Sequence, residues 1–378
     1  MSATHGGVVP VTVVTGVLGA GKTTLVNRLL RDPGGRDVAV VVNDMGEVNV
    51  DAELVERTDD GIVDLSNGCI CCRLQGDLLT SLERLAAERE FDALVVEASG
   101  ISEPVPIART LTVGDGERDP PDGYRLDTMV SVVDAYGFWK EFDAGESLPE
   151  SHDPTRPLAD VLVDGIEFCD VLLLNKCDLV PDDVLDEMAA VIGRLQPRAA
   201  RYRTVESDVP PEAVLDTGRF DFEAASREQG WKRELAGEAE TDGADGDGHG
   251  HDHGEQSAAA AHGIESTVYR RERPFDPARF DTWLDEWDGS VVRAKGFCWL
   301  TSRPDTVVGY SQAGPSVRVG PIGEWGEDDP ATRLVFIGRT LDREALVAAL
   351  DDCLATDEER ATPPDAEDDP FPRETVLG

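Results

Sequence analysis

Lysine is scarce in this sequence, and acidic residues far outnumber basic ones. Only five of the 35 basic residues are lysines, and 76 aspartates and glutamates give the chain a formal net charge of −41. Such a chain repels nucleic acid and anionic membranes, so neither is expected as a partner. Acidic surfaces keep proteins soluble where salt screens charge, which favours a high-salt cytoplasm of a halophile. A mesophilic acidic protein with two disordered acidic segments is the alternative.

Long hydrophobic runs are also absent. No apolar stretch approaches the roughly 20 residues that a membrane-spanning helix needs, and the first residues lack the pattern of a signal peptide. We therefore expect a cytoplasmic protein. Because 40% of the 378 residues are hydrophobic, the chain can build ordinary cores, and its length leaves room for two domains.

One complete phosphate-binding motif is present, Gly-Val-Leu-Gly-Ala-Gly-Lys-Thr at residues 16–23. It follows the apolar run Val8–Thr15 and leads into a segment of helical periodicity, which is the strand–loop–helix setting that the motif requires. Glycines let the backbone wrap around phosphate oxygens, the lysine reaches the β/γ-phosphates, and the threonine hydroxyl ligates Mg²⁺. The sequence therefore predicts a nucleoside triphosphate site formed by Gly16, Gly19, Ala20, Gly21, Lys22, Thr23 and Thr24.

Apolar strands alternate with helical segments over residues 1–205. Because several strands are nearly continuous apolar runs, we expect them to be parallel and covered by helices on both faces. This predicts a doubly wound, mostly parallel α/β domain that binds its ligand at the carboxyl ends of its strands. We expect strands at Val8–Thr15, Asp37–Asn43, Phe91–Glu97, Leu126–Asp134, Asp170–Asn175 and Ala199–Arg203, and helices at Thr23–Arg31, Leu74–Glu90 and Asp182–Leu195.

The rest of the chain divides by composition. Residues 206–262 are predicted to be a connector that ends in a disordered, acidic, histidine-containing linker from Ala236 onward. Residues 263–356 are predicted to form a smaller α+β domain, and residues 357–378 a loose acidic tail. In the α+β domain we expect strands at Glu265–Arg273, Val291–Thr301, Val307–Ser311 and Leu334–Gly338, and helices at Asp276–Trp287 and Asp342–Ala355.

A guanine-reading motif, Asn-Lys-Cys-Asp at residues 175–178, ends one of the predicted strands. The Asp178 carboxylate can accept both guanine N–H groups, and leaving that carboxylate unpaired would penalise ATP. Lys176 is expected to lie along the base, and Asn175 to brace the loop. Together with the phosphate loop, this motif predicts that the nucleotide is GTP.

Acidic residues at the ends of two other strands are candidates for the metal that accompanies the nucleotide. Glu97 can hold Mg²⁺ together with Thr23, and the N–H of Gly100 can reach the γ-phosphate. Asp44 and Glu47 can form the other nucleotide-sensitive switch segment near the metal, besides the one that begins at Gly100. An interpretation as exposed acids of an ordinary loop explains these two residues equally well. We assign Lys22, Thr23 and Glu97 to catalysis. No residue is recognisable as a catalytic base, so we expect slow intrinsic turnover that a partner raises.

Three of the seven cysteines fall within four residues, at Cys69, Cys71 and Cys72. Thiolates at this spacing can converge on one ion, and sulfur ligands favour Zn²⁺ or Cu⁺ over Mg²⁺. Three ligands leave a fourth position open for Glu47 or water, and an open site suits transfer of the metal to a receiving protein. Buried or redox-active cysteines are the alternative.

The remaining cysteines and the histidines give weaker signals. The histidines at residues 249–253 either recruit metal weakly or belong to a solvating polar tract. We interpret four further cysteines as packing residues: Cys169, Cys177, Cys298 and Cys353.

Taken together, these motifs resemble those of the CobW-type GTPase metallochaperones. The resemblance rests on the phosphate loop, the guanine motif and the residues at 43–47, 67–72, 97–100 and 293–297. It implies Mg²⁺-dependent hydrolysis of GTP, coupled to binding a transition metal, most often zinc, and delivering it to a client metalloprotein. It also implies kinship with the nickel-inserting GTPases of urease and hydrogenase maturation. Asp44 stands where the family usually has glutamate, which weakens a ligand role for that residue.

Other functions stay open at this point. The chain can be a cobalt (Co²⁺) chaperone for cobalamin biosynthesis, or a metal buffer or sensor with little GTP turnover. A P-loop kinase would use the same phosphate loop, but the guanine motif and the lack of an acceptor-substrate domain argue against it. The sequence specifies neither the client protein nor the oligomeric state, and a homodimer is compatible with it.

Overall fold

The computed structural model describes residues 8–42, 62–64, 72–88, 90–100, 102–114, 118–120, 122–143, 158–227, 264–285, 291–364 and 369–372. The chain divides into two compact units. The first comprises residues 1–139, 148–185 and 198–228, and the second comprises residues 140–147, 186–197 and 229–378. Helices α5 (Ala135–Asp143) and α7 (Asp182–Leu195) therefore contribute residues to both units.

The first unit is built on a seven-stranded sheet of order β3-β2-β4-β1-β5-β6-β7, in which all neighbouring strands are parallel. The strands are β1 (Val9–Thr15), β2 (Val38–Val42), β3 (Ile62–Asp64), β4 (Ala93–Glu97), β5 (Tyr124–Asp134), β6 (Val171–Asn175) and β7 (Ala200–Arg203). Parallel strands need crossover connections, and helices supply them here. The predicted doubly wound parallel sheet is confirmed.

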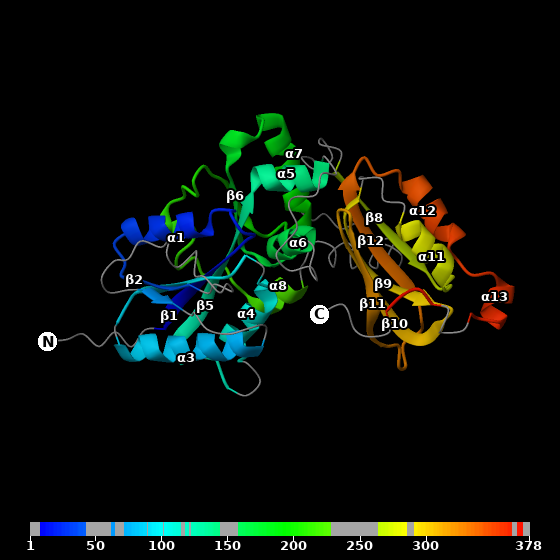
Figure 1. Cartoon of the computed structure of the whole chain (residues 1–378), viewed down its shortest axis with the longest axis horizontal. Coiled ribbons are helices and arrows are strands. Elements are labelled where there is room, and N and C mark those ends of the chain that lie inside the picture. The colour runs from blue at the N-terminus through cyan, green and yellow to red at the C-terminus, as the bar shows by residue number, and fades with distance from the viewer. Residues whose placement is uncertain are drawn as a thin grey trace, which may run out of the picture. The chain divides into compact units, whose positions relative to one another are not determined.

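Helices cover both faces of this sheet. On one face, Leu82 of α3, Leu111 of α4 and Phe168 of α6 share a cluster of buried side chains with Val13 and Val96 of the sheet. Helix α1 lies on the other side of the sheet from α3 (Figure 1). The helices not yet bounded are α1 (Lys22–Arg31), α3 (Cys72–Glu88), α4 (Pro104–Thr112), α6 (Leu158–Phe168) and α8 (Phe222–Arg227).

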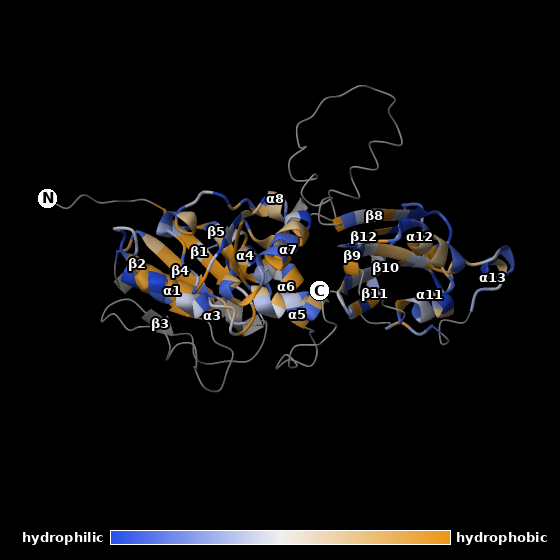
Figure 2. Cartoon of the chain, turned by 90° about the horizontal axis from the view of Figure 1, so that it is seen from above, coloured by the Kyte–Doolittle hydropathy of each residue, from blue (hydrophilic) through white to orange (hydrophobic). Residues whose placement is uncertain are grey.

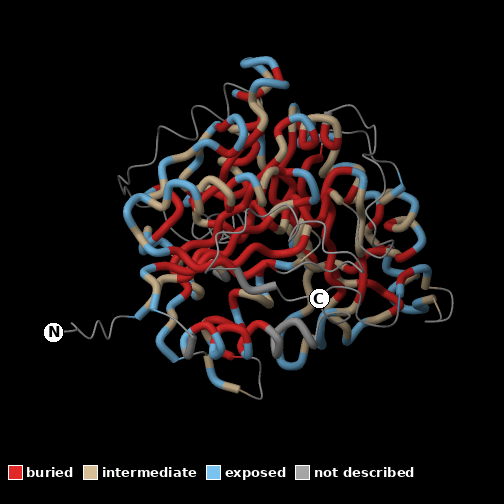
Figure 3. The backbone as a smooth tube through the Cα atoms, turned by 60° about the vertical axis from the view of Figure 1, so that its left-hand side comes forward, coloured by how far each residue is buried: buried red, intermediate tan, exposed pale blue. Residues whose placement is uncertain are grey.

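Apolar composition explains why the strands form the interior. Every residue of β2, β4 and β6 is buried, and the central strands appear as apolar and buried segments in Figures 2 and 3. Burial on both faces removes the alternation of polar and apolar residues, as expected for a covered parallel sheet. The sequence analysis did not predict four elements of the first unit, β3, α4, α5 and α6.

Physical reasons account for most of these differences. Strand β3 has only three residues, and α4 begins with Pro-Val-Pro, which reads as a turn although proline is favoured in the first helical turn. Nearly every residue of α6 is buried, so this helix lacks the polar face that makes helical periodicity visible.

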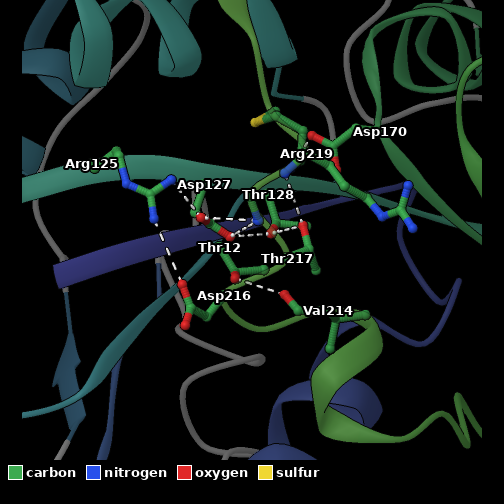
Figure 4. Close-up of polar contacts among 11 residues, drawn as sticks. Thr12, Arg125, Asp127, Thr128, Asp170, Val214, Asp216, Thr217 and Arg219 are labelled. Atoms are coloured by element: carbon green, nitrogen blue, oxygen red, sulfur yellow. Dashed lines mark hydrogen bonds and ion pairs between the residues drawn. The ribbon is translucent and has the colours of Figure 1, made fainter.

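A polar cluster at the amino ends of the strands ties the segment after β7 to the first unit (Figure 4). The Asp127 side chain is fully buried and accepts hydrogen bonds from the Gly218 N–H, 3.1 and 3.2 Å away, and from the Thr128 hydroxyl, 2.8 Å away. The Thr12 hydroxyl donates to the carbonyl of Val214. Residues up to at least 220 are therefore part of this unit, whereas we expected a connector to begin at residue 206.

The second unit contains an antiparallel five-stranded sheet of order β11-β10-β9-β12-β8. Phe280 of α11, Leu350 of α12 and Phe336 of the sheet belong to one buried cluster, so both helices pack on the same face. The predicted α+β fold is confirmed. The elements are β8 (Ile264–Arg271), β9 (Val291–Leu300), β10 (Arg303–Ala313), β11 (Ser316–Glu324), β12 (Thr332–Arg339), α11 (Pro277–Leu284), α12 (Arg343–Asp352) and α13 (Asp357–Ala361).

Two expectations for this unit were wrong. The strand β11 was not predicted, because it contains glycine and a proline at an irregular register, Val308 opposite Pro321. The tail is not loose where the structure describes it. Helix α13 carries a capping box between Thr356 and Glu359, and Phe371 is buried in the core of the unit.

Of the helices that the structure describes, none combines the length and the hydropathy that crossing a bilayer requires.

Candidate functional site

The predicted phosphate loop connects the end of β1 to the start of α1. Its three glycines have positive φ angles of 139° at Gly16, 77° at Gly19 and 112° at Gly21. A Cβ on Gly16 would lie 2.2 Å from the carbonyl oxygen of Val132, and one on Gly21 would lie 2.3 Å from the Asn175 side-chain nitrogen. Only glycine fits these two positions. A glycine loop that leads directly into the N-terminus of a helix, as this one leads into α1, is the arrangement that binds phosphate.

Lys22, Thr23 and Glu97 meet beside this loop. The Lys22 side chain is buried, and its Nζ donates to the carbonyl of Val17, 3.2 Å away. The Thr23 hydroxyl donates to Oε1 of Glu97, 2.7 Å away. Glu97 is buried at the end of β4, in register with Val14 of β1. A hydroxyl and a carboxylate that converge in this way are hard oxygen donors of the kind that Mg²⁺ prefers.

Gly100 lies against the phosphate loop. A Cβ at this position would come within 2.7 Å of the Leu18 backbone nitrogen, so the two backbones are in close contact. The N–H of Ala98 donates to the carbonyl of Val14. The segment after β4 is thus held against β1 before Ser99 and lies against the phosphate loop after it. The predicted residue Thr24 is exposed at the start of α1.

Asn175 connects the guanine motif to the phosphate loop. Its side-chain amide donates to the carbonyl of Ala20, 2.8 Å away, and its oxygen accepts from the Ser207 N–H and the Thr204 hydroxyl. The side chain is buried. Asn175 therefore occupies the bracing position expected for it, and the hydrogen bonds show how the two motifs hold a common geometry.

Lys176 and Asp178 follow in a short turn. Lys176 adopts a left-handed conformation with φ 61°, which is unusual for lysine and occurs where function requires a special backbone. Its Nζ lies 2.6 Å from Oδ2 of Asp134, the last residue of β5. The Asp178 side chain is exposed in the turn Cys177–Leu179. Asp178 comes three residues after Asn175, which contacts the phosphate loop. Its exposed carboxylate is available to the guanine base of a nucleotide.

The loop after β7 is a part of the site that the sequence analysis missed. The Ser207 hydroxyl donates to the carbonyl of Gly21, 2.9 Å away. Glu206 and Ser207 both have positive φ angles, and Arg28 holds the loop through the Glu206 carbonyl and the Asp208 carboxylate. The one available signal was its position after a strand, at the edge where ligands bind.

Most of the predicted transition-metal site lies outside the described residues. Asp44, Glu47, Cys69 and Cys71 are not described, and of Cys72 only its position as the first residue of α3 is known. Strand β3 ends at Asp64 and runs parallel to β2. Strand β3 therefore ends at the same edge of the sheet as β1, which the phosphate loop follows, and Cys69 comes five residues after Asp64 in the sequence. Among the described residues, no group of three or more His, Cys, Asp or Glu side chains is placed to hold a metal.

The four other cysteines lie within the described parts of the chain, and Cys177 is only partly buried. Cys169, Cys298 and Cys353 are buried, and burial raises the pKa of the Cys169 and Cys298 thiols far above the usual value. A thiol that resists ionisation is a poor metal ligand. Their burial agrees with the packing role predicted for them.

A parallel sheet with a glycine loop between β1 and α1 and Asn-Lys-x-Asp after β6 defines a P-loop domain of the GTPase class. Comparisons with known proteins agree. The family described as CobW/HypB/UreG, nucleotide-binding domain, matches residues 10–203, and the cobalamin synthesis protein cobW C-terminal domain matches residues 264–354. The chain belongs to the CobW/HypB/UreG family of P-loop GTPases.

Relatives within the family are similar over most of their length. The chain is 35% identical to zinc-regulated GTPase metalloprotein activator 1 of Dictyostelium discoideum, over 93% of this chain and 80% of that protein. It is 28% identical to the zinc chaperone CobW of a Sinorhizobium species, over 91% of this chain and 97% of that protein. It is 26% identical to the zinc chaperone YjiA of Escherichia coli K12, over 90% and 97% respectively.

Proposed function

We propose that this chain is a GTP-hydrolysing metallochaperone. It binds a transition metal, most favourably zinc, through Cys69, Cys71 and Cys72, and transfers the metal to a client metalloprotein. The names of the relatives, two of them zinc chaperones, support zinc as the cargo. Sulfur ligands at this spacing support it independently, because thiolates select zinc over the hard cations.

The observation that carries the proposal is the register of the strand ends. Val42 of β2 pairs with Asp64 of β3 on one side and with Glu97 of β4 on the other. Neighbouring strands lie about 4.8 Å apart, so β3 and β1 are separated by about 14 Å across the sheet. Strand β3 ends at this edge, and Cys69 follows Asp64 by only five residues in the sequence, which supports a metal site within loop reach of the nucleotide.

The chemistry at the nucleotide follows from the residues beside it. Lys22 would bind the β/γ-phosphates, while Asn175 and Ser207 hold the loop around them. Thr23 and Glu97 would hold Mg²⁺, which neutralises phosphate charge when bound. Asp178 would accept the guanine N–H groups and so select GTP.

Coupling between metal and nucleotide is the testable core of the proposal. Nucleotide state must change the affinity for Zn²⁺, and Zn²⁺ must change the affinity for nucleotide by the same factor. We expect a competition titration with a chromophoric zinc chelator to give different affinities for the apo, GDP-bound and non-hydrolysable-GTP-bound chain. Cys71→Ser should weaken zinc binding and leave nucleotide binding by metal-free protein unchanged, whereas Cys353→Ser is the matched control that keeps both.

Equal zinc affinity in all three nucleotide states would reject the coupling. Zinc binding that survives Cys71→Ser would reject the assignment of the ligands, and absence of phosphate release from GTP would reject the hydrolase activity. These outcomes are independent of one another, so each part of the proposal fails separately.

A further inference from the structure

The segment Asp369–Pro372 occupies a socket on the second unit. The Phe371 side chain is 6% exposed and belongs to the buried cluster of the unit, with its ring centroid 5.8 Å from that of Phe280 on α11. The Asp369 side chain is completely buried. A short segment thus places one aromatic ring and one carboxylate into the domain, which are the two kinds of anchor that dominate peptide recognition.

Arg303, at the start of β10, recognises this segment through three groups. Its Nε lies 2.8 Å from Oδ2 of Asp369, and its two terminal nitrogens donate to the carbonyls of Phe371 and Pro372. The neighbouring Ser302 hydroxyl also donates to Asp369. The Arg303 side chain is only 9% exposed. The Asp369 carboxylate also accepts from the Phe371 N–H, 2.8 Å away, so the segment is folded into a turn. One buried guanidinium that binds a carboxylate and two backbone carbonyls forms a site for an acidic peptide in such a turn.

The segment lies outside the residues that match the family domain. The match to the C-terminal family domain ends at residue 354, so α13 and Asp369–Pro372 lie beyond it. Arg303, Ser302 and Phe280 lie within the matched residues. The socket is therefore formed by the family domain, and the residues that fill it come from outside that domain.

We propose that this socket is a peptide-docking site, which the chain's own segment occupies as an internal ligand. The external occupant is a peptide of another protein with a carboxylate two residues before an aromatic side chain. Removing the internal segment without replacement would leave the Arg303 charge buried and unpaired, which is unfavourable. Exchange of one occupant for another avoids that cost. This inference concerns the second unit and does not depend on the nucleotide or the metal.

The experiment uses the full chain and a fluorescein-labelled peptide with the sequence of residues 366–374, measured by fluorescence anisotropy. An internal segment competes at an effective concentration on the order of millimolar. We therefore expect weak but saturable binding to the wild-type chain, and binding at least about tenfold tighter to Phe371→Ala, whose internal ligand is weakened. The double variant Phe371→Ala/Arg303→Ala should not bind the labelled peptide. A control peptide with alanine in place of phenylalanine should bind neither Phe371→Ala nor the double variant.

Three results would overturn the proposal. A wild-type chain that excludes the peptide at millimolar concentration would show that the segment is a permanent part of the core. Equal binding of the alanine peptide would show that the socket does not read the aromatic ring. Concentration-dependent dimers of the wild-type chain in light scattering, dissociated by the peptide, would show that the occupant is a second copy. Phe371→Leu, with GTP binding as a check on folding, replaces Phe371→Ala if that variant unfolds.

Discussion

The two ends of the parallel sheet both bury polar side chains, but for different purposes. At the amino end, Asp127 is enclosed by groups of the same unit, the Gly218 N–H, the Thr128 hydroxyl and Arg125 (Figure 4). At the carboxyl end, Asn175 binds backbone atoms and holds open a glycine loop. A closed network stabilises the fold, whereas a braced glycine loop at a helix N-terminus is suited to bind a ligand.

The largest effect expected from this comparison is on catalysis. Lys22→Ala should reduce GTP turnover by at least about 10³-fold, because it removes the cation placed for the phosphates. Melting temperature should change by only a few degrees, since that side chain donates its hydrogen bond to a loop carbonyl. Phosphate release and thermal unfolding measure the two effects, with Lys140→Ala on α5 as the matched control. Full turnover by Lys22→Ala would show that Lys22 does not act on the phosphates, and would contradict the functional role given to the carboxyl end of the sheet.

The second largest effect is expected at the opposite end. Asp127→Ala should lower the free energy of unfolding by about 3 kcal/mol, because it removes a fully buried carboxylate together with its hydrogen bonds to the Gly218 N–H and the Thr128 hydroxyl and its ion pair with Arg125. Turnover per folded molecule should stay unchanged. Denaturant unfolding measures the loss. The control is Asp216→Asn, at an exposed partner of the same Arg125 at 3.6 Å. Asparagine tolerates the φ of 52° at this position, so the change should cost less than about 1 kcal/mol. Equal losses in the two variants would contradict the role given to burial.

Base selection should show a smaller effect. Asp178→Asn should reduce the preference for GTP over ATP, measured as the ratio of kcat/KM values, by about 30-fold, or about 2 kcal/mol. Asp182→Asn, at the exposed start of α7, should leave the ratio unchanged. An undiminished preference for GTP in Asp178→Asn would show that another group reads the base.

Local sequence motifs made the carboxyl end of the parallel sheet predictable from the sequence. The phosphate loop and the guanine motif follow strands, and continuous apolar runs such as β6 identify those strands without further information. Ser207 could not be found in this way, because its role depends on contacts with Gly21 and Asn175, which are 186 and 32 residues away in sequence. The high-salt habitat stays a prediction, since nothing in the fold tests it.

The amino-end cluster was unpredictable for a related reason. Asp127 interrupts the apolar pattern of β5 at an irregular register with β1, where Val11 pairs with Leu126 and Thr12 with Thr128. A bulge places an extra residue that no periodicity announces. In the sequence, Asp170 likewise looks like an ordinary polar residue at the start of a predicted strand. Tertiary contacts alone reveal that both carboxylates are enclosed.

The smallest effect, and the most specific to the closed network, is a pH dependence at Asp170. Burial, together with the nearby Asp127 carboxylate, raises the pKa of Asp170 to about 7, although the Met129 N–H, Arg219 and Arg198 act in the opposite direction. The unfolded chain has a pKa of about 3.9 for this group, so the folded state binds the proton more tightly. Its contribution to stability is therefore complete below about pH 4 and is lost as the pH rises through 7.

Asp170→Asn should remove this dependence while keeping an acceptor for the Met129 N–H, 2.9 Å from the carboxylate. Between pH 6 and pH 8 we expect the free energy of unfolding of the wild type to fall by about 1–2 kcal/mol relative to the variant. Urea unfolding of both proteins across this range measures the difference, and constant costs of the substitution cancel because only the slope is compared. Parallel curves would mean that Asp170 is ionised throughout, and that the amino end of the sheet is more open to solvent than its hydrogen bonds indicate.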